Sequence, residues 1–302
     1  MPRFGKGSRT QREPWRLPAQ PTQVPGIMAD EAVLGELTVR AASLVGPGHR
    51  SAEPATVRQD AYRLGRDAAG DYLVIAVADG VSNSRRSDLG AAVAVSSAVS
   101  SAVELLRSGF APTTQWAPTL FAATAKRIRE EAAGRGLSDD DVCAVLITAI
   151  LPARLREGGP QHAWVGWLGD VSLWELGEGY WRPAAGDNKR DEGGMASNAL
   201  SAVLPRSPEF AQSSLVPLMP GSVLTFVTDG VGDGLAGLPD LNKLLASRWA
   251  SPPPIADFIN HVGYDAEQFL DDRSAVTVWV GPQARRPRSP SPRLAAHARP
   301  PR

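Results

Sequence analysis

The chain contains very little cysteine. Its 302 residues include one, Cys143. A single cysteine excludes a disulfide within the chain and also a zinc cluster built from several thiolates. Since disulfide-free chains are typical of reducing compartments, we expect a cytoplasmic protein.

Long apolar runs are also missing. The longest covers residues 142–151 and is interrupted by Thr148, whereas a membrane-spanning helix needs about 20 apolar residues. We therefore expect no membrane span. The N-terminus carries charge without an apolar region behind it, so it does not resemble a secretory signal.

Net charge is absent because 32 Lys and Arg residues balance 32 Asp and Glu residues. The balance hides an asymmetry. Residues 1–26 carry five basic residues and one acidic residue, and residues 282–302 carry six Arg and no acid. Both segments are also proline-rich, a composition that buries too little apolar surface to fold, so we predict disordered tails around one domain at 27–281. The acidic character of that domain argues against nucleic acid as a partner.

A P-loop fingerprint is missing as well, which argues against that class of nucleotide-binding protein. The pattern that is present groups strands with strands and helices with helices. We expect strands at 36–44, 72–78, 142–151, 162–168, 171–176, 222–228 and 275–280, and helices at 89–107, 116–134, 235–250 and 255–263. Gly169-Asp170 is expected to form a tight hairpin turn between two of the strands. This grouping favours an α+β fold with antiparallel sheets covered by helices.

Acidic residues stand beside several of these strands. An apolar run at 73–78 ends at Asp79-Gly80, and the strand at 222–228 ends at another Asp-Gly pair beginning with Asp229. Asp60 and the Asp271-Asp272 pair adjoin further strands. Residues at strand ends often form sites, so these acidic positions could meet in one metal cluster. An Asp-Gly pair is equally the ordinary sequence of a turn, and both interpretations stay open at this point.

The available ligand types favour a hard divalent cation. Carboxylates and backbone carbonyls are the ligands that Mg²⁺ and Mn²⁺ prefer. Four histidines scattered along the chain and a single cysteine argue against a zinc site of nitrogen and sulfur ligands. Two such ions at one site can orient a phosphoryl group for attack by water.

Several blocks occur in a fixed order: GPGHRSAEPATVRQDAY, AVADGVSNS, WVGWLGDVSLWEL, VLTFVTDGVGDGL and FLDDRSAVTVWV. The ordered set resembles the type 2C family of metal-dependent protein phosphatases, especially its bacterial branch. The resemblance extends from about residue 37 to residue 280. It implies a four-layer α-β-β-α sandwich of two antiparallel sheets flanked by helix pairs.

The resemblance also implies a protein-serine/threonine phosphatase, in which a metal-bound water hydrolyses phosphoserine and phosphothreonine. The cofactor would be two Mn²⁺ or Mg²⁺ ions, with a third, weaker ion. The expected partner is a phosphorylated protein, either a Ser/Thr kinase or its target, and we expect the phosphatase to be a monomer. The implied metal residues are Asp60, Asp79, Gly80 through its carbonyl, Asp229 and Asp271, with Asp170 and Asp233 at the third ion.

The chain departs from the family pattern in the first block. Many members have a phosphate-gripping arginine five residues before the aspartate, where this chain has Ala55. His49, Arg50 and Arg58 are the nearby cations that could bind phosphate instead. Asp272 stands where Asn is common, and alignment favours Asp271 as the ligand.

These departures leave two alternative functions open. The chain could be a catalytically weak relative that acts as a phosphoprotein-binding or regulatory scaffold, or a hydrolase of small phosphate esters. The Gly-rich, charged segment at 187–197 is expected to be a mobile flap facing the substrate, or else an ordinary surface insertion.

Overall fold

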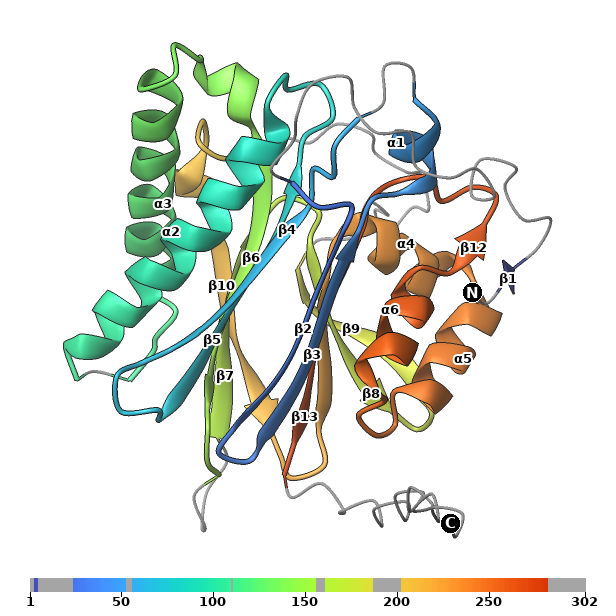
Figure 1. Ribbon diagram of the computed structural model, residues 1–302. Helices are drawn as coiled ribbons and strands as arrows, with labels where there is room; N and C mark the ends of the chain where they lie inside the picture. The colour runs from blue at the N-terminus through green and yellow to red at the C-terminus, as the bar shows by residue number, and fades with distance from the viewer. Residues whose placement is uncertain are drawn as a thin grey trace, which may run out of the picture.

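Two antiparallel sheets stacked face to face form the centre of the computed structural model (Figure 1). The model describes residues 3–4, 24–52, 56–109, 111–155, 161–186 and 202–281. The five-stranded sheet has the order β10 (Gln212–Leu218), β7 (Gln161–Leu168), β6 (Ala144–Pro152), β5 (Tyr72–Gly80) and β4 (Ala61–Arg66). The six-stranded sheet has the order β2 (Ile27–Leu34), β3 (Leu37–Leu44), β13 (Arg273–Val280), β11 (Val223–Val227), β8 (Ser172–Gly177) and β9 (Tyr180–Gly186).

Helices cover the outer face of each sheet. The five-stranded sheet carries α2 (Ser87–Arg107) and α3 (Trp116–Ala133), and the six-stranded sheet carries α4 (Asp229–Gly237), α5 (Pro239–Arg248) and α6 (Ile255–Val262). Shorter elements are α1 (Pro47–Ser51), β1 (Arg3–Phe4), β12 (Asp265–Ala266) and the 3₁₀ turns Asp139–Val142 and Pro208–Phe210. The four-layer α-β-β-α sandwich expected from the resemblance is therefore confirmed.

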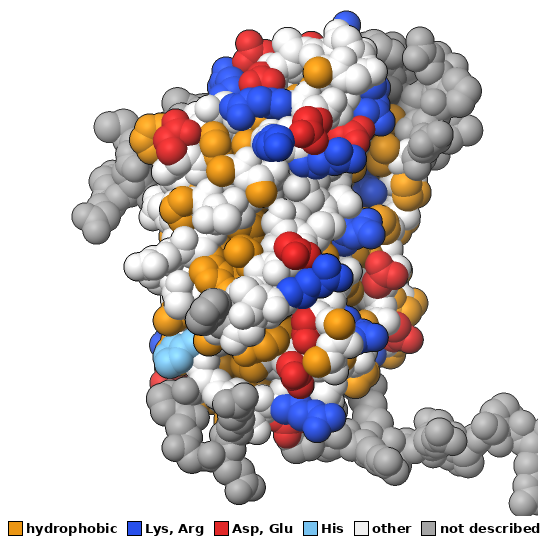
Figure 2. Space-filling view, turned by 90° about the vertical axis from the view of Figure 1, so that its left-hand side faces the viewer, with side chains coloured by type: hydrophobic (Ala, Val, Ile, Leu, Met, Phe, Trp, Pro, Cys, Tyr) orange, Lys and Arg blue, Asp and Glu red, His pale blue; other side chains and the backbone are white. Residues whose placement is uncertain are grey.

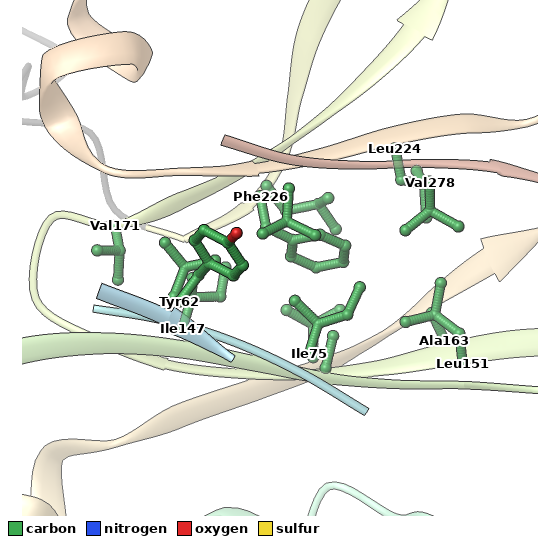
Figure 3. Packing of buried hydrophobic residues seen from close by; sticks show 14 of the residues in the cluster. Tyr62, Ile75, Ile147, Leu151, Ala163, Val171, Leu224, Phe226 and Val278 are labelled. Atoms are coloured by element: carbon green, nitrogen blue, oxygen red, sulfur yellow. The ribbon is translucent and has the colours of Figure 1, made fainter. Parts of the chain in front are cut away.

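Three apolar cores separate the four layers. Between the sheets, Ile75 and Ile147 from one sheet face Phe226 and Val278 from the other (Figure 3). A second core lies under α2 and α3. The small Ala side chains of α2 let this helix approach the sheet closely. The third lies under α4–α6 and is rich in aromatic rings, such as Trp249 and Phe258 with centroids 4.7 Å apart. Because β5 is covered on both faces, its sequence is apolar at successive positions rather than alternating.

The expected hairpin at Gly169-Asp170 is wrong. β7 pairs with β6 and β10, whereas β8 pairs with β9 and β11, so the turn carries the chain from one sheet to the other. Gly169 has a φ of 85°, a backbone conformation that suits a hairpin turn and also a turn that links two sheets. A turn sequence between two strands defines a change of direction, but it does not determine which strands pair.

Most other elements lie within two residues of their expected limits. The expected helix at 235–250 is instead two helices, because Pro239 begins α5 and α4 already starts at Asp229. β2, β4 and β10 were not expected. Outside the named strands, Leu204 forms an antiparallel bridge with Ala144.

Helix α2 is long and apolar enough to cross a membrane, judged by length and composition alone. Core helices meet the same criterion, and α2 packs against β4, β5, β6 and α3. Over the helical face, acidic and basic side chains lie next to each other (Figure 2), as in the ion pair between Arg127 and Glu131 at 2.8 Å. Among the described residues of this face, basic and acidic side chains are therefore mixed.

The structure describes part of the predicted N-terminal tail and none of the predicted C-terminal tail. Arg3–Phe4 forms β1, and residues 24–26 lead into β2. Residues 282–302 lie outside the described residues, as does the segment 187–197 predicted to be a flap.

Candidate functional site

The strand register brings the expected acidic residues to one end of the sandwich. Ala61, the first residue of β4, pairs with Ala78, so Asp60 lies beside the end of β5 that carries Asp79. In the other sheet, Val227 at the end of β11 pairs with Ala275 of β13 and with Ser172 of β8. Three aspartates lie within two residues of these strands: Asp229 follows the end of β11, Asp271 precedes the start of β13, and Asp170 precedes the start of β8. Asp233 lies one turn further along α4.

Hydrogen bonds join the two sheets directly at this end. Asp60 precedes a strand of the five-stranded sheet, and its Oδ2 accepts from Thr228 Oγ1 and Ser274 Oγ, both at 2.8 Å. Thr228 and Ser274 belong to the six-stranded side, and Ser274 N also donates to Thr228 Oγ1 at 3.0 Å. Asp60 is only 2% exposed, and its Oδ1 has no hydrogen-bond partner among the described residues. One carboxylate oxygen is therefore fixed while the other remains available to a ligand.

Two glycines allow the backbones of the site to approach closely. A Cβ on Gly230 would lie 1.9 Å from the carbonyl oxygen of Asp272, and a Cβ on Gly80 would lie 2.9 Å from that of Gln59. Both contacts are with backbone atoms, which cannot move aside as the end of a flexible side chain could. These contacts place the turn of Asp229 against Asp271-Asp272, and the turn of Asp79 against Asp60.

Burial and the charges of neighbouring carboxylates raise the pKa of Asp60, Asp79 and Asp271. Burial, followed by the charges of Asp60, Asp229 and Asp271, raises the pKa of Asp79 well above its ordinary value. Burial and the charge of Asp272 do the same to Asp60, although the hydrogen bonds from Thr228 and Ser274 act in the opposite direction. Burial and the charge of Asp229 raise the pKa of Asp271 to about 6. The cluster is thus a concentration of negative charge that a cation would relieve.

Asp272 has a different role from its neighbour Asp271. It is 1% exposed, and its oxygens accept from Gly46 N at 2.6 Å, Gln59 N at 2.6 Å and His49 Nδ1 at 2.9 Å. These bonds tie both ends of the 46–59 segment to the start of β13. Because its acceptors are engaged, Asp272 is a poor candidate for a metal ligand, and the geometry favours Asp271.

The three cations considered for phosphate binding differ in their surroundings. Arg58 is 3% exposed and donates to Pro25 O, Ser43 Oγ and Asp60 O, so it supports the site from behind instead of facing a substrate. Burial would lower the pKa of His49, but its hydrogen bond to Asp272 raises that pKa to about 9. Arg50 is half-buried, and its Nε has no hydrogen-bond partner among the described residues. Ala55, where the family has arginine, lies outside them.

Sequence reasoning missed the side chains that support the acidic cluster. Thr228 and Ser274 hold Asp60, and Tyr264 Oη donates to Gly230 O at 2.7 Å. The buried guanidinium of Arg273 donates to the backbone oxygens of Tyr264 and Phe269 and lies 4.1 Å from the centre of the Tyr264 ring. Their position next to the acidic residues was the one sequence signal that could have identified them. Thr228 directly precedes Asp229, and Arg273 and Ser274 follow Asp272.

The chemistry of these residues suits a hard divalent cation. The donor set is composed of carboxylates and a backbone carbonyl, and the unpartnered Oδ1 of Asp60 supplies a buried acceptor. Within the described part of the chain, no group of three or more His, Cys, Asp or Glu side chains already has the spacing of a formed metal site. Metal binding would therefore require these carboxylates to draw together.

Comparison with known proteins identifies the same family as the sequence blocks do, the type 2C protein phosphatases. The family model for protein phosphatase 2C matches residues 45–254, a span that includes Asp60, Asp79 and Asp229 but ends before Asp271. No curated protein matches the chain.

Similar solved structures include bacterial phosphatases. PppA, described as a key regulatory component of T6SS in Pseudomonas aeruginosa, is 18% identical, and the match covers 82% of this chain and 99% of PppA with a TM-score of 0.53. The S. agalactiae serine/threonine phosphatase is 15% identical over 81% of this chain and 99% of its own, with a TM-score of 0.56. The PPM Ser-Thr phosphatase MsPP from Mycobacterium smegmatis is 17% identical over 80% and 98%, also with a TM-score of 0.56. At these identities, the likeness shows the fold.

Proposed function

Since the chain belongs to the protein phosphatase 2C family, we propose that it hydrolyses phosphoserine and phosphothreonine in a protein substrate with two Mn²⁺ or Mg²⁺ ions. The observation that carries the proposal is the meeting of Asp60, Asp79, Asp229 and Asp271 where the two sheets join. We further propose a cytoplasmic monomer whose substrate is a Ser/Thr kinase or a target of one.

The acidic residues and the Gly80 carbonyl would be the ligands of the ions. Asp79, the Gly80 carbonyl, Asp229 and Asp271 would bind them, with Asp60 Oδ1 contributing directly or through water. Asp170 and Asp233 would serve a third, weaker ion. When bound, the ions would supply a Lewis acid for the phosphoryl group and lower the pKa of the attacking water.

The surrounding residues position this set. Thr228 and Ser274 fix one oxygen of Asp60 and so aim the other at the cluster. Asp272 fastens the 46–59 segment, including His49 and Arg50, against the strand that follows Asp271. His49 and Arg50 are consequently the described cations best placed to orient phosphate oxygens, whereas Arg58 is committed to the backbone behind the site.

The test is initial-rate hydrolysis of a phosphothreonine peptide and of para-nitrophenyl phosphate with Mn²⁺, Mg²⁺ or chelator. We expect turnover that requires metal and that falls by at least about 100-fold in Asp79→Asn, because even a residue that only supports a ligand can cost that much. Asp71→Asn is the matched control, since Asp71 is exposed at the opposite end of the same strand. Absence of metal-dependent turnover from folded wild-type protein would refute the enzyme assignment.

Two observations favour the scaffold alternative. The described carboxylates are neighbours without forming a ready metal site, and Arg58 is buried away from a substrate. A scaffold would bind the phosphothreonine peptide and release it unchanged, which calorimetry and mass spectrometry of the peptide would show. A hydrolase of small esters would instead turn over para-nitrophenyl phosphate or nucleotides and leave the peptide intact.

A further inference from the structure

A chain of buried polar side chains leads from Arg58 to the candidate metal ligand Asp60. Arg58 donates from Nη1 to Ser43 Oγ at 2.7 Å. Ser43 Oγ lies 2.6 Å from Ser274 Oγ, and Ser274 Oγ lies 2.8 Å from Asp60 Oδ2. All four residues are at most 3% exposed, so bulk water does not compete for these contacts.

Strand pairing brings the two serines of this chain together. Ser43 of β3 is directly opposite Ser274 of β13. Both point into the core between the sheets, because alternate residues of their strands are members of that core. These members are Leu37, Val39 and Ala41 of β3 and Val276, Val278 and Val280 of β13. A hydroxyl buried in an apolar core costs free energy unless it is hydrogen-bonded, and the chain satisfies both hydroxyls.

The direction of each hydrogen bond follows by elimination. An ionised Asp60 carboxylate, the form that binds a cation, can only accept, so Ser274 donates its one hydroxyl hydrogen to Asp60. Ser43 must then donate to Ser274, while its own oxygen accepts from Arg58, a side chain that can only donate. Thr228 Oγ1 accepts from Ser274 N at 3.0 Å and therefore donates its hydrogen to Asp60 Oδ2. The chain thus runs one way, from a cation to an anion.

We propose that Ser43 is a positioning residue for Asp60. Hydrogen bonds that all run in one direction polarise and strengthen one another, and Ser43 is the link that extends this effect from the guanidinium to the carboxylate. Arg58 otherwise bonds to Asp60 only at its backbone oxygen. Ser43 therefore helps to hold Oδ2 of Asp60 and keeps Oδ1 turned toward the ions. The consequence for metal binding rests on the proposed function, whereas the hydrogen-bond chain does not.

Urea unfolding in chelator tests the chain without metal. Among the described hydrogen bonds, none joins Ser43 directly to Asp60, yet their substitutions should not be additive, because both break the same chain. We expect the stability lost by Ser43→Ala to fall by roughly half when Asp60→Asn is already present. Additive losses would overturn the proposal.

Thr277→Val is the matched control. Thr277 Oγ1 and Thr225 Oγ1 form another buried hydroxyl pair, 2.8 Å apart, in the same sheet. Thr277 follows Ser274 by three residues in β13, so its side chain lies on the opposite face of the strand. Thr277→Val should cost the same stability whether residue 60 is Asp or Asn.

Calorimetry and electron paramagnetic resonance with Mn²⁺ test the consequence. Ser43→Ala should bind Mn²⁺ roughly tenfold more weakly, as is usual when the support of a metal ligand is removed, and the spectrum of its bound Mn²⁺ should change. Thr277→Val should match the wild type in both measurements. A Ser43→Ala protein that is less stable but has wild-type affinity and spectrum would show a merely structural role and overturn the proposal. Wild-type protein that binds no Mn²⁺ would refute the proposed function, and the unfolding experiment in chelator would still decide whether Ser43 acts on Asp60.

Discussion

At the scale of single residues, Asp271 and Asp272 are adjacent in the chain but serve opposite purposes. Asp271 faces the other carboxylates, and burial together with their charges raises its pKa to about 6. Asp272 is almost completely buried and accepts three hydrogen bonds from the 46–59 segment. Asp271 is therefore positioned to bind a cation, whereas Asp272 stabilises the fold.

Substituting each aspartate by Ala should separate these purposes. Asp272→Ala leaves the buried amides of Gly46 and Gln59 without an acceptor, so we expect it to lower the free energy of unfolding by about 3 kcal/mol. Asp271→Ala removes a charge from a repelling cluster, so its stability should be unchanged or higher while its Mn²⁺ affinity is lost. Urea unfolding and titration calorimetry measure the two effects. Equal losses of stability would show that both residues are structural.

The acidic residues could be found from the sequence because each stands where an apolar strand ends. The hydroxyls of Thr228 and Ser274 could not, since Thr and Ser are common in strands and their value lies in reaching Asp60 from the other sheet. Arg58 was misjudged for a related reason. A basic residue beside a phosphatase motif looks like a phosphate ligand, and only the fold shows that it is buried.

At the scale of elements, the main helices and most strands could be predicted from the sequence. Each of them buries apolar residues in one or two of the three cores, and this burial leaves a clear apolar pattern in the sequence. The prediction failed where pairing partners decide the outcome. The turn at Gly169-Asp170 has the sequence of a hairpin, yet β7 and β8 enter different sheets. Edge strands β2 and β10 were missed because one side of each faces solvent and their apolar patterns are diluted.

Helix α6 offers a prediction about pH. Trp249 Nε1 donates to His261 Nδ1 at 3.3 Å, so the folded protein needs a neutral imidazole. Burial, followed by the charge of Arg248, lowers the pKa of His261 in the folded state. The unfolded state therefore takes up the proton first as the pH falls through about 6.5, and stability contributed by this residue is present above that pH and lost below it.

His261→Gln should remove this dependence, because its amide oxygen can accept from Trp249 at any pH. Urea unfolding between pH 7.5 and pH 5 should show the wild-type protein losing stability relative to the variant as the pH falls. The raised pKa values of the acidic cluster affect both proteins alike and cancel in the difference. Parallel pH profiles would show that the two rings are not coupled in this way.

At the scale of the whole molecule, the acidic cluster lies where the two sheets meet. Asp60 and Asp79 lie at the end of one sheet, and Asp229 and Asp271 lie next to strand ends of the other, while Thr228 and Ser274 bond across the junction. Repulsion within the cluster therefore pushes the sheets apart at this end, and the three apolar cores must resist it. A site built to hold cations is consequently a source of instability without them.

The stability of Asp79→Asn should reveal this conflict. Asp79 is affected by the charges of Asp60, Asp229, Asp271 and Asp170, so neutralising it removes several repulsions without changing its shape. At pH 8 in chelator, we expect the variant to melt a few degrees above wild type, since about 1 kcal/mol corresponds to roughly 2–4 °C in a domain of this size. Adding Mn²⁺ should raise the melting temperature of the wild type by ligand binding and leave the variant nearly unchanged, which reverses their order. Asp71→Asn should follow the wild type in both conditions. A variant that melts lower in chelator would mean that the negative charge of Asp79 is satisfied within the protein and that the cluster needs no cation.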